Sequence, residues 1–187
     1  MAAEVKRLFL ALWPDAAARQ GLAALARAVA LPAGARRVHP EDLHLTLQFL
    51  GAVPLERLPA VREAAAGVEA EPVGLELTRV GCWPRPRVAW CAPDETPAEL
   101  SGLVARLGAR LAAVGYPAES RPFRPHVTLA RKVRRLADAR LVQPLFWRCA
   151  DLALVESLAR PAPPRYQVLE HWPLAEKAGK QKENELD

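Results

Sequence analysis

The sequence contains one short polar pattern twice, as His44-Leu45-Thr46-Leu47 and as His126-Val127-Thr128-Leu129, although the chain has only four histidines. Side chains two residues apart on a β-strand point to the same side, so each histidine shares a face with its threonine. The aliphatic residues of each pattern take the opposite face, which suits a buried core. We therefore expect two strands that present imidazoles and hydroxyls to one cleft, with four catalytic residues: His44, Thr46, His126 and Thr128.

Two imidazoles facing one cleft suit acid–base catalysis of a displacement at phosphorus. Neutral imidazole accepts a proton from water, whereas imidazolium donates one to a leaving oxygen, and both forms are accessible near neutral pH. In-line attack places nucleophile and leaving group on opposite sides of phosphorus, where a symmetric pair would stand. The threonine hydroxyls would donate hydrogen bonds to the non-bridging oxygens as charge grows there. This chemistry requires no metal, and the symmetry leaves open which histidine is the acid and which the base.

The remaining histidines and the cysteines show no repeated arrangement of this kind. His39 lies in an expected loop and His171 at the end of an expected strand, so we assign structural roles to both. Cys82, Cys91 and Cys149 are odd in number and lack the spacing of metal ligands. We expect free buried thiols, no metal site and no cofactor.

The two patterns belong to a larger internal repeat. Each follows an apolar strand, a short stop that includes proline and aspartate, and a helix rich in alanine and leucine. The two patterns start 82 residues apart and the two preceding strands start 80 residues apart. The duplicated strand–helix–strand units comprise strand 7–12, helix 16–30 and the first pattern, then strand 87–91, helix 97–114 and the second pattern.

The rest of the chain predicts further elements around these units. They are a helix over 55–68, a strand over 73–80, a stiff proline-containing loop over 81–86, a loop or short helix at 136–139, and strands over 146–156 and 166–171. We predict an α+β fold with two pseudo-symmetric lobes, each an antiparallel sheet with helices on its outer side, and an active-site cleft between them. Residues 1–174 would form this single bilobal domain. Residues 175–187 are charged and nearly free of large apolar groups, and we expect a disordered tail.

Composition and charge agree with a globular enzyme. The 187 residues are 51% hydrophobic, and charged residues precede a short apolar run near the N-terminus, so we expect neither a signal peptide nor a membrane span and place the protein in the cytoplasm. The net charge is +5 and the isoelectric point is about 9.5. The basic residues that flank the two patterns either hold phosphates beside the cleft or form a solvated surface. They are Arg36, Arg37, Arg121, Arg124, Arg131, Lys132, Arg134 and Arg135.

Taken in order, these segments resemble a known family. RLFLAL (7–12), LHLTLQFLG (43–51), RVAW (87–90) and RPFRPHVTLARK (121–132) are similar to the bacterial and archaeal RNA 2′,3′-cyclic phosphodiesterases, also called 2′-5′ RNA ligases, of the 2H phosphoesterase superfamily. The likeness continues through Glu156-Ser157 and YQVL (166–169). It implies metal-independent hydrolysis of RNA 2′,3′-cyclic phosphate ends to 2′-phosphomonoesters, with reversible 2′-5′ ligation as the same chemistry run backwards. It also implies that His44 is the proton donor and His126 the proton acceptor.

Two further residues are candidates for substrate binding. Arg131 matches the arginine that closes the second family motif, and its planar guanidinium could contact the phosphate. Strict alternation from His126 gives Arg131 the wrong parity, so it reaches the cleft only if the strand ends or bulges near Ala130. Phe9 could stack on a nucleobase, and Trp83 is an alternative in the loop that we expect at 81–86.

The expected partner is RNA that ends in a 2′,3′-cyclic phosphate, including tRNA fragments, bound by a monomer without membrane contact. Two other functions fit the same residues. One is a related superfamily activity on a small cyclic phosphate or on 2′-5′ oligoadenylate. The other is a binding module that holds RNA ends without turnover, although a binding-only protein would be expected to have lost a histidine or threonine, and both patterns are intact.

Overall fold

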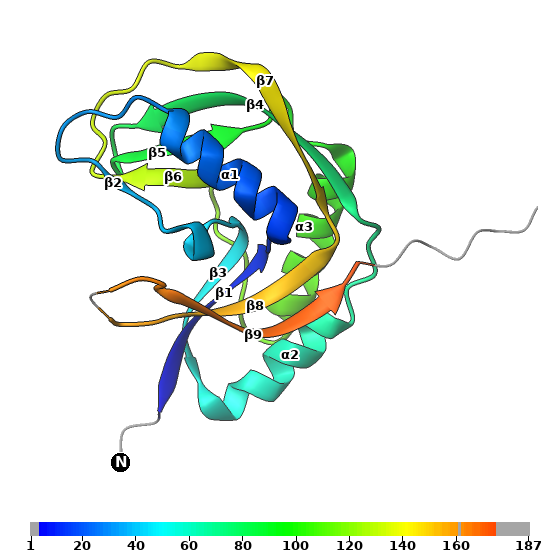
Figure 1. Ribbon diagram of the computed structural model, residues 1–187. Coiled ribbons are helices and arrows are strands. Elements are labelled where there is room, and N and C mark those ends of the chain that lie inside the picture. Colours follow the sequence, from blue (N-terminus) through cyan, green and yellow to red (C-terminus); the bar gives the residue numbers. More distant parts are fainter. Residues whose placement is uncertain (1–3, 161, 175–187) are drawn as a thin grey trace, which may run out of the picture.

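Nine antiparallel strands join into one strongly curved sheet in the computed structural model, which describes residues 4–160 and 162–174 (Figure 1). The expected tail, 175–187, lies outside the described residues. The elements in chain order are β1 (Val5–Leu12), α1 (Ala16–Ala28), β2 (Arg36–Arg37), η1 (Pro40–Asp42), β3 (Leu45–Pro54), η2 (Leu55–Arg57), α2 (Leu58–Ala66), β4 (Val73–Trp83), β5 (Val88–Ala92), α3 (Ala98–Ala113), β6 (Val127–Arg131), β7 (Ala139–Cys149), β8 (Asp151–Ser157) and β9 (Tyr166–Pro173). The strand order is β7-β4-β5-β6-β3-β1-β8-β9, and β2 pairs with β6.

The sheet divides into two halves. One contains β3, β1, β8 and β9, and the other contains β7, β4, β5, β6 and the short β2. In the part of the chain that the structure describes, one antiparallel partnership joins the halves, that of Leu45 on β3 with Val127 on β6. The predicted α+β fold with two antiparallel halves is confirmed, and this bridge makes the halves continuous.

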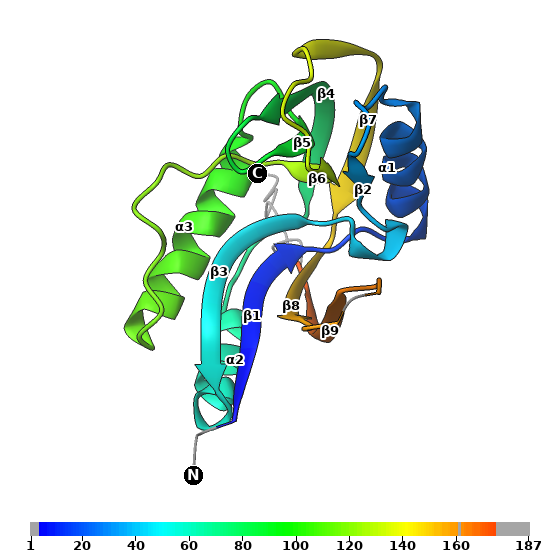
Figure 2. The same cartoon turned by 90° about the vertical axis from the view of Figure 1, so that its left-hand side faces the viewer.

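The predicted duplication is visible in the pairing. In the unit β1–α1–β3 the first strand pairs antiparallel with the last, and the same holds in β5–α3–β6. The helix of each unit packs on the opposite half, because α1 contacts β6 and β7, whereas α3 contacts β3. Figure 2 shows α1 and α3 on opposite sides of the molecule. Each half of the sheet is therefore covered by a helix that the other half supplies.

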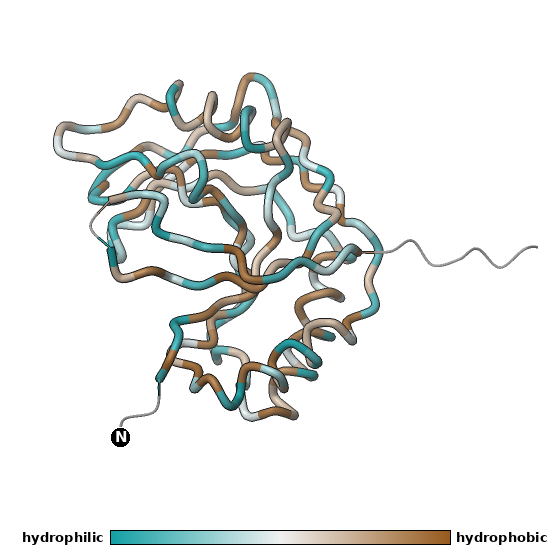
Figure 3. Tube along the Cα trace, turned by 60° about the horizontal axis from the view of Figure 1, so that its bottom comes forward, coloured by the Kyte–Doolittle hydropathy of each residue, from teal (hydrophilic) through white to brown (hydrophobic). Residues whose placement is uncertain are grey.

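The helices form where the sequence places their apolar rows, and α1 begins at the cap that the sequence predicts. The Asp15 carboxylate accepts a hydrogen bond from the Ala18 backbone N–H at 2.8 Å, which fixes the start of α1. Helix α3 buries Leu100, Leu103, Leu107 and Leu111, a spacing of three and four residues that keeps them on one face. Hydropathy alternates accordingly along the helices (Figure 3).

Residues 8–12 of β1 are buried on both faces of the sheet, which explains their unbroken apolar sequence, whereas Val5 and Arg7 near the start of the strand are exposed. Leu8, Leu10 and Leu12 belong to the main core beneath the helices. Phe9 and Ala11 belong to a second apolar cluster on the other face of the sheet, with Ala153 and Val155 of β8. An alternating pattern of polar residues would require one face to meet solvent, and over residues 8–12 neither face of β1 does so.

The expected strand over 146–156 is wrong, since β7 ends at Cys149 and β8 begins at Asp151 in the other half of the sheet. The sequence stays apolar where the chain passes from β7 to β8, so hydropathy does not indicate that one strand ends and another begins there. Strand β7 also begins earlier than predicted, at Ala139 rather than at residue 146. It includes Pro144, which an edge strand tolerates because one side of its backbone has no partner strand. Residues 81–83 belong to β4 rather than to a loop. Of the loop or short helix expected at 136–139, a loop forms over 136–138 and β7 begins at Ala139.

Candidate active site

The two repeated patterns meet at the bridge between the halves. Each histidine directly precedes its strand, since β3 begins at Leu45 and β6 begins at Val127. Residues opposite each other in an antiparallel pair share a face, so the Leu45–Val127 partnership puts both sets of aliphatic residues on the core side. The four polar residues take the other side, where all are partly buried: His44, Thr46, His126 and Thr128. The structure therefore brings the four predicted residues together.

A β-bulge follows the threonine in both strands. On β3, Thr46 pairs with Ala11 and Gln48 with the adjacent Leu10, so β3 carries one extra residue. On β6, Thr128 and Ala130 pair in the same way with the adjacent residues Trp90 and Ala89 of β5. The sequence of buried and exposed residues is identical over 45–49 and 127–131. Each bulge returns the fifth residue after the histidine to the histidine's face of the sheet.

The bulges decide the position of two side chains. Arg131 is exposed on the cleft side, and its Nη2 donates a hydrogen bond to the Tyr166 hydroxyl at 3.2 Å. The sequence predicted that Arg131 could face the histidines only if the strand ended or bulged near Ala130, and the bulge of β6 fulfils that condition. The equivalent residue of the first half is Phe49, whose side chain is 59% exposed. Sequence reasoning missed Phe49, although it lies 82 residues before Arg131, the same offset that relates the histidines.

Backbone carbonyls hold both imidazoles by the same atom. His44 Nδ1 lies 2.7 Å from the carbonyl oxygen of Asp42, and His126 Nδ1 lies 2.8 Å from that of Arg124. A carbonyl oxygen only accepts, so Nδ1 carries the hydrogen in both rings and Nε2 is left for proton transfer. In the neutral His44 ring, Nε2 accepts from the Thr46 hydroxyl at 3.0 Å.

Aromatic rings enclose the histidines and change their acidity. Trp13 stacks on His44 with a centroid distance of 5.4 Å, and Trp83 meets His126 edge to face at 4.6 Å. Burial lowers the pKa of His44 to about 4, against the opposing effect of the Asp42 carbonyl, and the charge of Arg131 lowers it further. Burial also lowers the pKa of His126. Both imidazoles are therefore neutral in the free protein at pH 7.

Phe9 occupies a different place from the one that base stacking requires. Its side chain is only 2% exposed, and its ring packs against His44, Phe49 and Tyr166 at centroid distances of 4.9, 5.9 and 5.1 Å. The buried ring is not accessible to a nucleobase, and it packs against the imidazole of His44 instead. Trp83, the alternative stacking candidate, lies at the end of β4 against His126.

Asp42 was not identified from the sequence, and it positions the catalytic residue candidate His44 through hydrogen bonds. It is 5% exposed, and its carboxylate accepts hydrogen bonds from the backbone N–H groups of Arg165 at 2.8 Å and Tyr166 at 3.2 Å. The same residue orients His44 through its carbonyl. Asp42 thus ties the ring of His44 to the start of β9, and no spacing in the sequence indicates that contact.

The flanking basic residues divide by role. Arg37 donates to the carbonyl oxygens of Ala26 and Val29 at the end of α1, so it is structural. Arg121 pairs with Glu119. Arg36, by contrast, is the direct cross-strand partner of Arg131. Other exposed members of the basic flank are Arg124, Lys132, Arg134 and Arg135.

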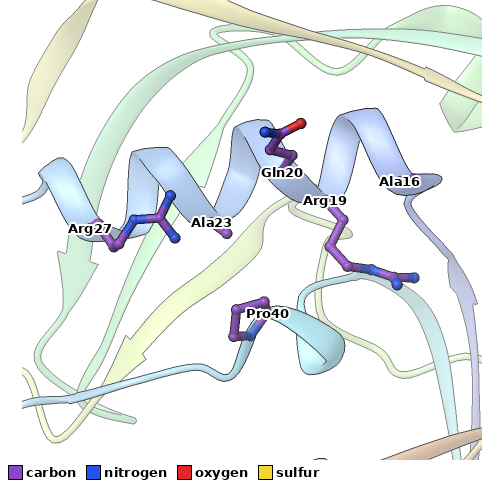
Figure 4. Close-up of a pocket in the computed structure, with 6 residues that line it drawn as sticks. All are labelled: Ala16, Arg19, Gln20, Ala23, Arg27 and Pro40. Carbon is purple, nitrogen blue, oxygen red and sulfur yellow. The ribbon is translucent and has the colours of Figure 1, made fainter.

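A separate hollow lies between α1 and η1, away from both patterns. It is lined by residues of α1 and by one residue of η1: Ala16, Arg19, Gln20, Ala23, Arg27 and Pro40 (Figure 4). None of the predicted site residues lines it. Over residues 4–160 and 162–174, no three His, Cys, Asp or Glu side chains gather as metal ligands would, and no helix has the length and apolarity to cross a membrane.

Comparison with known proteins yields consistent matches. The family model described as LigT like Phosphoesterase matches residues 12–90 and 92–163. A Thermus thermophilus protein named RNA 2′,3′-cyclic phosphodiesterase is 37% identical, with 94% of this chain and 93% of that protein covered. An Escherichia coli protein of the same name is 31% identical, with 92% and 99% covered. The crystal structure of E. coli LigT complexed with 3′-AMP superposes with a TM-score of 0.84 at 29% identity, over 92% of this chain and all of that one.

Proposed function

Because this chain belongs to the LigT-like phosphoesterase family, we propose that it hydrolyses RNA 2′,3′-cyclic phosphate ends to 2′-phosphomonoesters. The observation that carries the proposal is the pseudo-symmetric pair of histidines and threonines on one face of the sheet, on either side of the Leu45–Val127 bridge. Each histidine has Nδ1 fixed by a carbonyl, which leaves Nε2 as the atom for proton transfer; in His44 this atom accepts a hydrogen bond from the Thr46 hydroxyl until the ring is protonated.

The reaction needs one imidazole on each side of phosphorus. In the role assignment that follows the family resemblance, His126 Nε2 takes a proton from water while the water oxygen forms a bond to phosphorus. The bond from phosphorus to the 3′ oxygen breaks, and that oxygen receives the proton carried by His44 Nε2. The products are a 2′-phosphate and a free 3′ hydroxyl. An RNA 5′ hydroxyl in place of water gives a 2′-5′ phosphodiester by the same steps, so ligation is the reverse of cleavage at such a bond.

The remaining residues stabilise the charge that develops on phosphorus. The hydroxyls of Thr46 and Thr128 share the face of the histidines and donate to the non-bridging oxygens. Arg131 adds a fixed positive charge at the cleft, where its guanidinium is already held by the Tyr166 hydroxyl. A bound phosphate anion favours the charged imidazolium, which offsets the burial that keeps His44 neutral in the free protein.

The proposal is tested with an end-labelled RNA that ends in a 2′,3′-cyclic phosphate, in buffer with EDTA. We expect the wild-type protein to release a 2′-phosphate end, and His44→Ala and His126→Ala each to lower kcat by roughly 10²–10⁴-fold, the usual contribution of a general acid or base. His171→Ala is the matched control, because His171 is an exposed histidine of β9.

Three results would contradict this assignment. A 3′-phosphate product would mean that the other ring oxygen leaves. Binding of the RNA without turnover in all four proteins would favour the binding module. Turnover of a cyclic mononucleotide or 2′-5′ oligoadenylate, with none of the RNA, would favour the related superfamily activity.

A further inference from the structure

Two arginines lie directly opposite each other at the edge of the cleft. Arg36 of β2 and Arg131 of β6 are antiparallel partners. Like charges at directly opposed positions of a sheet repel each other and are destabilising. Among the residues that the structure describes, neither arginine forms an ion pair with a carboxylate, and Arg131 is hydrogen-bonded to the neutral Tyr166 hydroxyl. The protein thus keeps two cations together without supplying an anion for either.

The backbone places Arg36 on the side of the cleft. Its neighbour Arg37 points toward α1, since it donates to the carbonyls of Ala26 and Val29. The cross-strand partner of Arg37 is Ala130, which is fully buried. Successive side chains of a strand point to opposite faces, so Arg36 takes the other face, which it shares with its partner Arg131.

Two more cations lie next to this pair along the backbone, Lys132 directly after Arg131 and Arg87 directly before Val88, the β5 partner of Arg131. Arg87 and Lys132 both have left-handed backbone conformations, with φ of 69° and 61°, which are uncommon for residues other than glycine. A hydrogen bond of 3.0 Å from the Val133 N–H to the Arg87 carbonyl holds the two turns together. Both side chains are exposed, and in the described part of the chain neither has a carboxylate partner. We call Arg36, Arg87, Arg131 and Lys132 the cationic rim.

We propose that the cationic rim, through Arg36 above all, binds the phosphate on the 5′ side of the terminal nucleotide. The inference rests on the proposed function, in which Arg131 serves the reacting phosphate. A cyclic mononucleotide brings one phosphate and leaves Arg36 without a counter-ion, whereas an RNA chain brings a second phosphate that relieves the repulsion between the two arginines. The preferred substrate is therefore an oligonucleotide end rather than a free cyclic nucleotide.

Direct binding tests this without relying on turnover. The probes are a trinucleotide that ends in a 2′-phosphate and a nucleoside 2′-phosphate, titrated against wild type, Arg36→Gln and the control Arg106→Gln, which removes an exposed arginine from α3. We expect Arg36→Gln to weaken binding of the trinucleotide roughly tenfold, as for loss of one charged hydrogen bond, and to change binding of the mononucleotide by less than about twofold. The slope of log K against log salt for the trinucleotide should fall by about 0.7 in magnitude.

The outcomes separate this inference from the proposed function. Equal weakening of both ligands, no weakening of either, or no preference of the wild type for the trinucleotide would overturn the second-phosphate site. The cyclic forms of both ligands are then tested for turnover. Absence of turnover with the binding pattern intact would refute the proposed reaction and leave the site standing. The melting temperature of Arg36→Gln should not fall, because the substitution removes a repulsive contact, whereas a structural role would lower it.

Discussion

At the scale of single residues, the two histidines of the cleft start from the same state. Each has its hydrogen on Nδ1, and burial lowers the pKa of each below the ordinary value of 6.5. The proposed reaction requires that one of them carry a second proton while the other does not. The productive form of the free enzyme is therefore a minor species at neutral pH, and its population depends directly on proton concentration.

This predicts a particular pH dependence. Above about pH 6.5 both pKa values have been passed, so the singly protonated pair declines tenfold for each unit of pH and kcat/KM should decline with it. The measurement is kcat/KM between pH 6 and 9 with a cyclic-phosphate substrate. A rate that stays constant from pH 7 to 9 would show that one imidazole keeps its proton in the free enzyme, contrary to the effect of burial on both.

At the scale of elements, the matched bulges of β3 and β6 make the cleft asymmetric. They present Phe49 on one side and Arg131 on the other at equivalent positions. The arginine suits an anion. The exposed phenylalanine suits the flat face of a base, because aromatic stacking is available to any nucleobase. The two halves share a backbone geometry at this position, and we expect them to bind different parts of a nucleotide.

We expect Phe49→Ala to weaken binding of adenosine 2′-phosphate by about 1–3 kcal/mol, the usual effect of removing a stacking ring, and to leave binding of inorganic phosphate unchanged. Calorimetric titration of both ligands measures this. Phe146→Ala is the control, since Phe146 is 67% exposed on β7. If Phe49→Ala weakened phosphate equally, the ring would act by supporting His44 through Phe9 rather than by stacking.

Elements also show which features could be predicted from the sequence. The parity of His44 with Thr46, the helices, the Asp15 cap of α1 and the duplication follow from local sequence patterns, and the structure contains them. The helix expected over 55–68 is divided into the 3₁₀ helix η2 and the α-helix α2. Alternation alone gave the wrong parity for Arg131, because a bulge depends on pairing with a partner strand. The crossing at Ala150 was missed because β7 and β8 are continuous in hydropathy and separate only in the sheet. Asp42 was missed because its partners lie at 165 and 166.

At the scale of the whole molecule, the exchange of helices couples the two halves. Helix α1 is contributed by one unit and covers β6 and β7 of the other half, and α3 covers β3 in return. If the helix contributed by one unit unfolded, the core face of the other half of the sheet would be exposed to solvent. Unfolding of one half should therefore carry the other with it.

We expect a single cooperative thermal transition, with equal calorimetric and van't Hoff enthalpies. Leu103→Ala, which truncates a fully buried side chain of α3, should lower the free energy of unfolding by about 2–5 kcal/mol while the transition stays single. Ser101→Ala, at an exposed position of the same helix, is the control. Two resolved transitions in Leu103→Ala would mean that the halves fold independently.

The helix exchange also has a consequence for ancestry. A chain with only one strand–helix–strand unit would have a helix that finds no sheet of its own to cover, and two such chains would complete each other as a swapped dimer. That dimer would already hold two imidazoles across a twofold axis, but its two ends would be identical and would read a bound strand in either direction. In this chain the two units are joined and differ at equivalent positions, so Phe49 and Arg131 give the site a polarity that a symmetric dimer of one unit would lack.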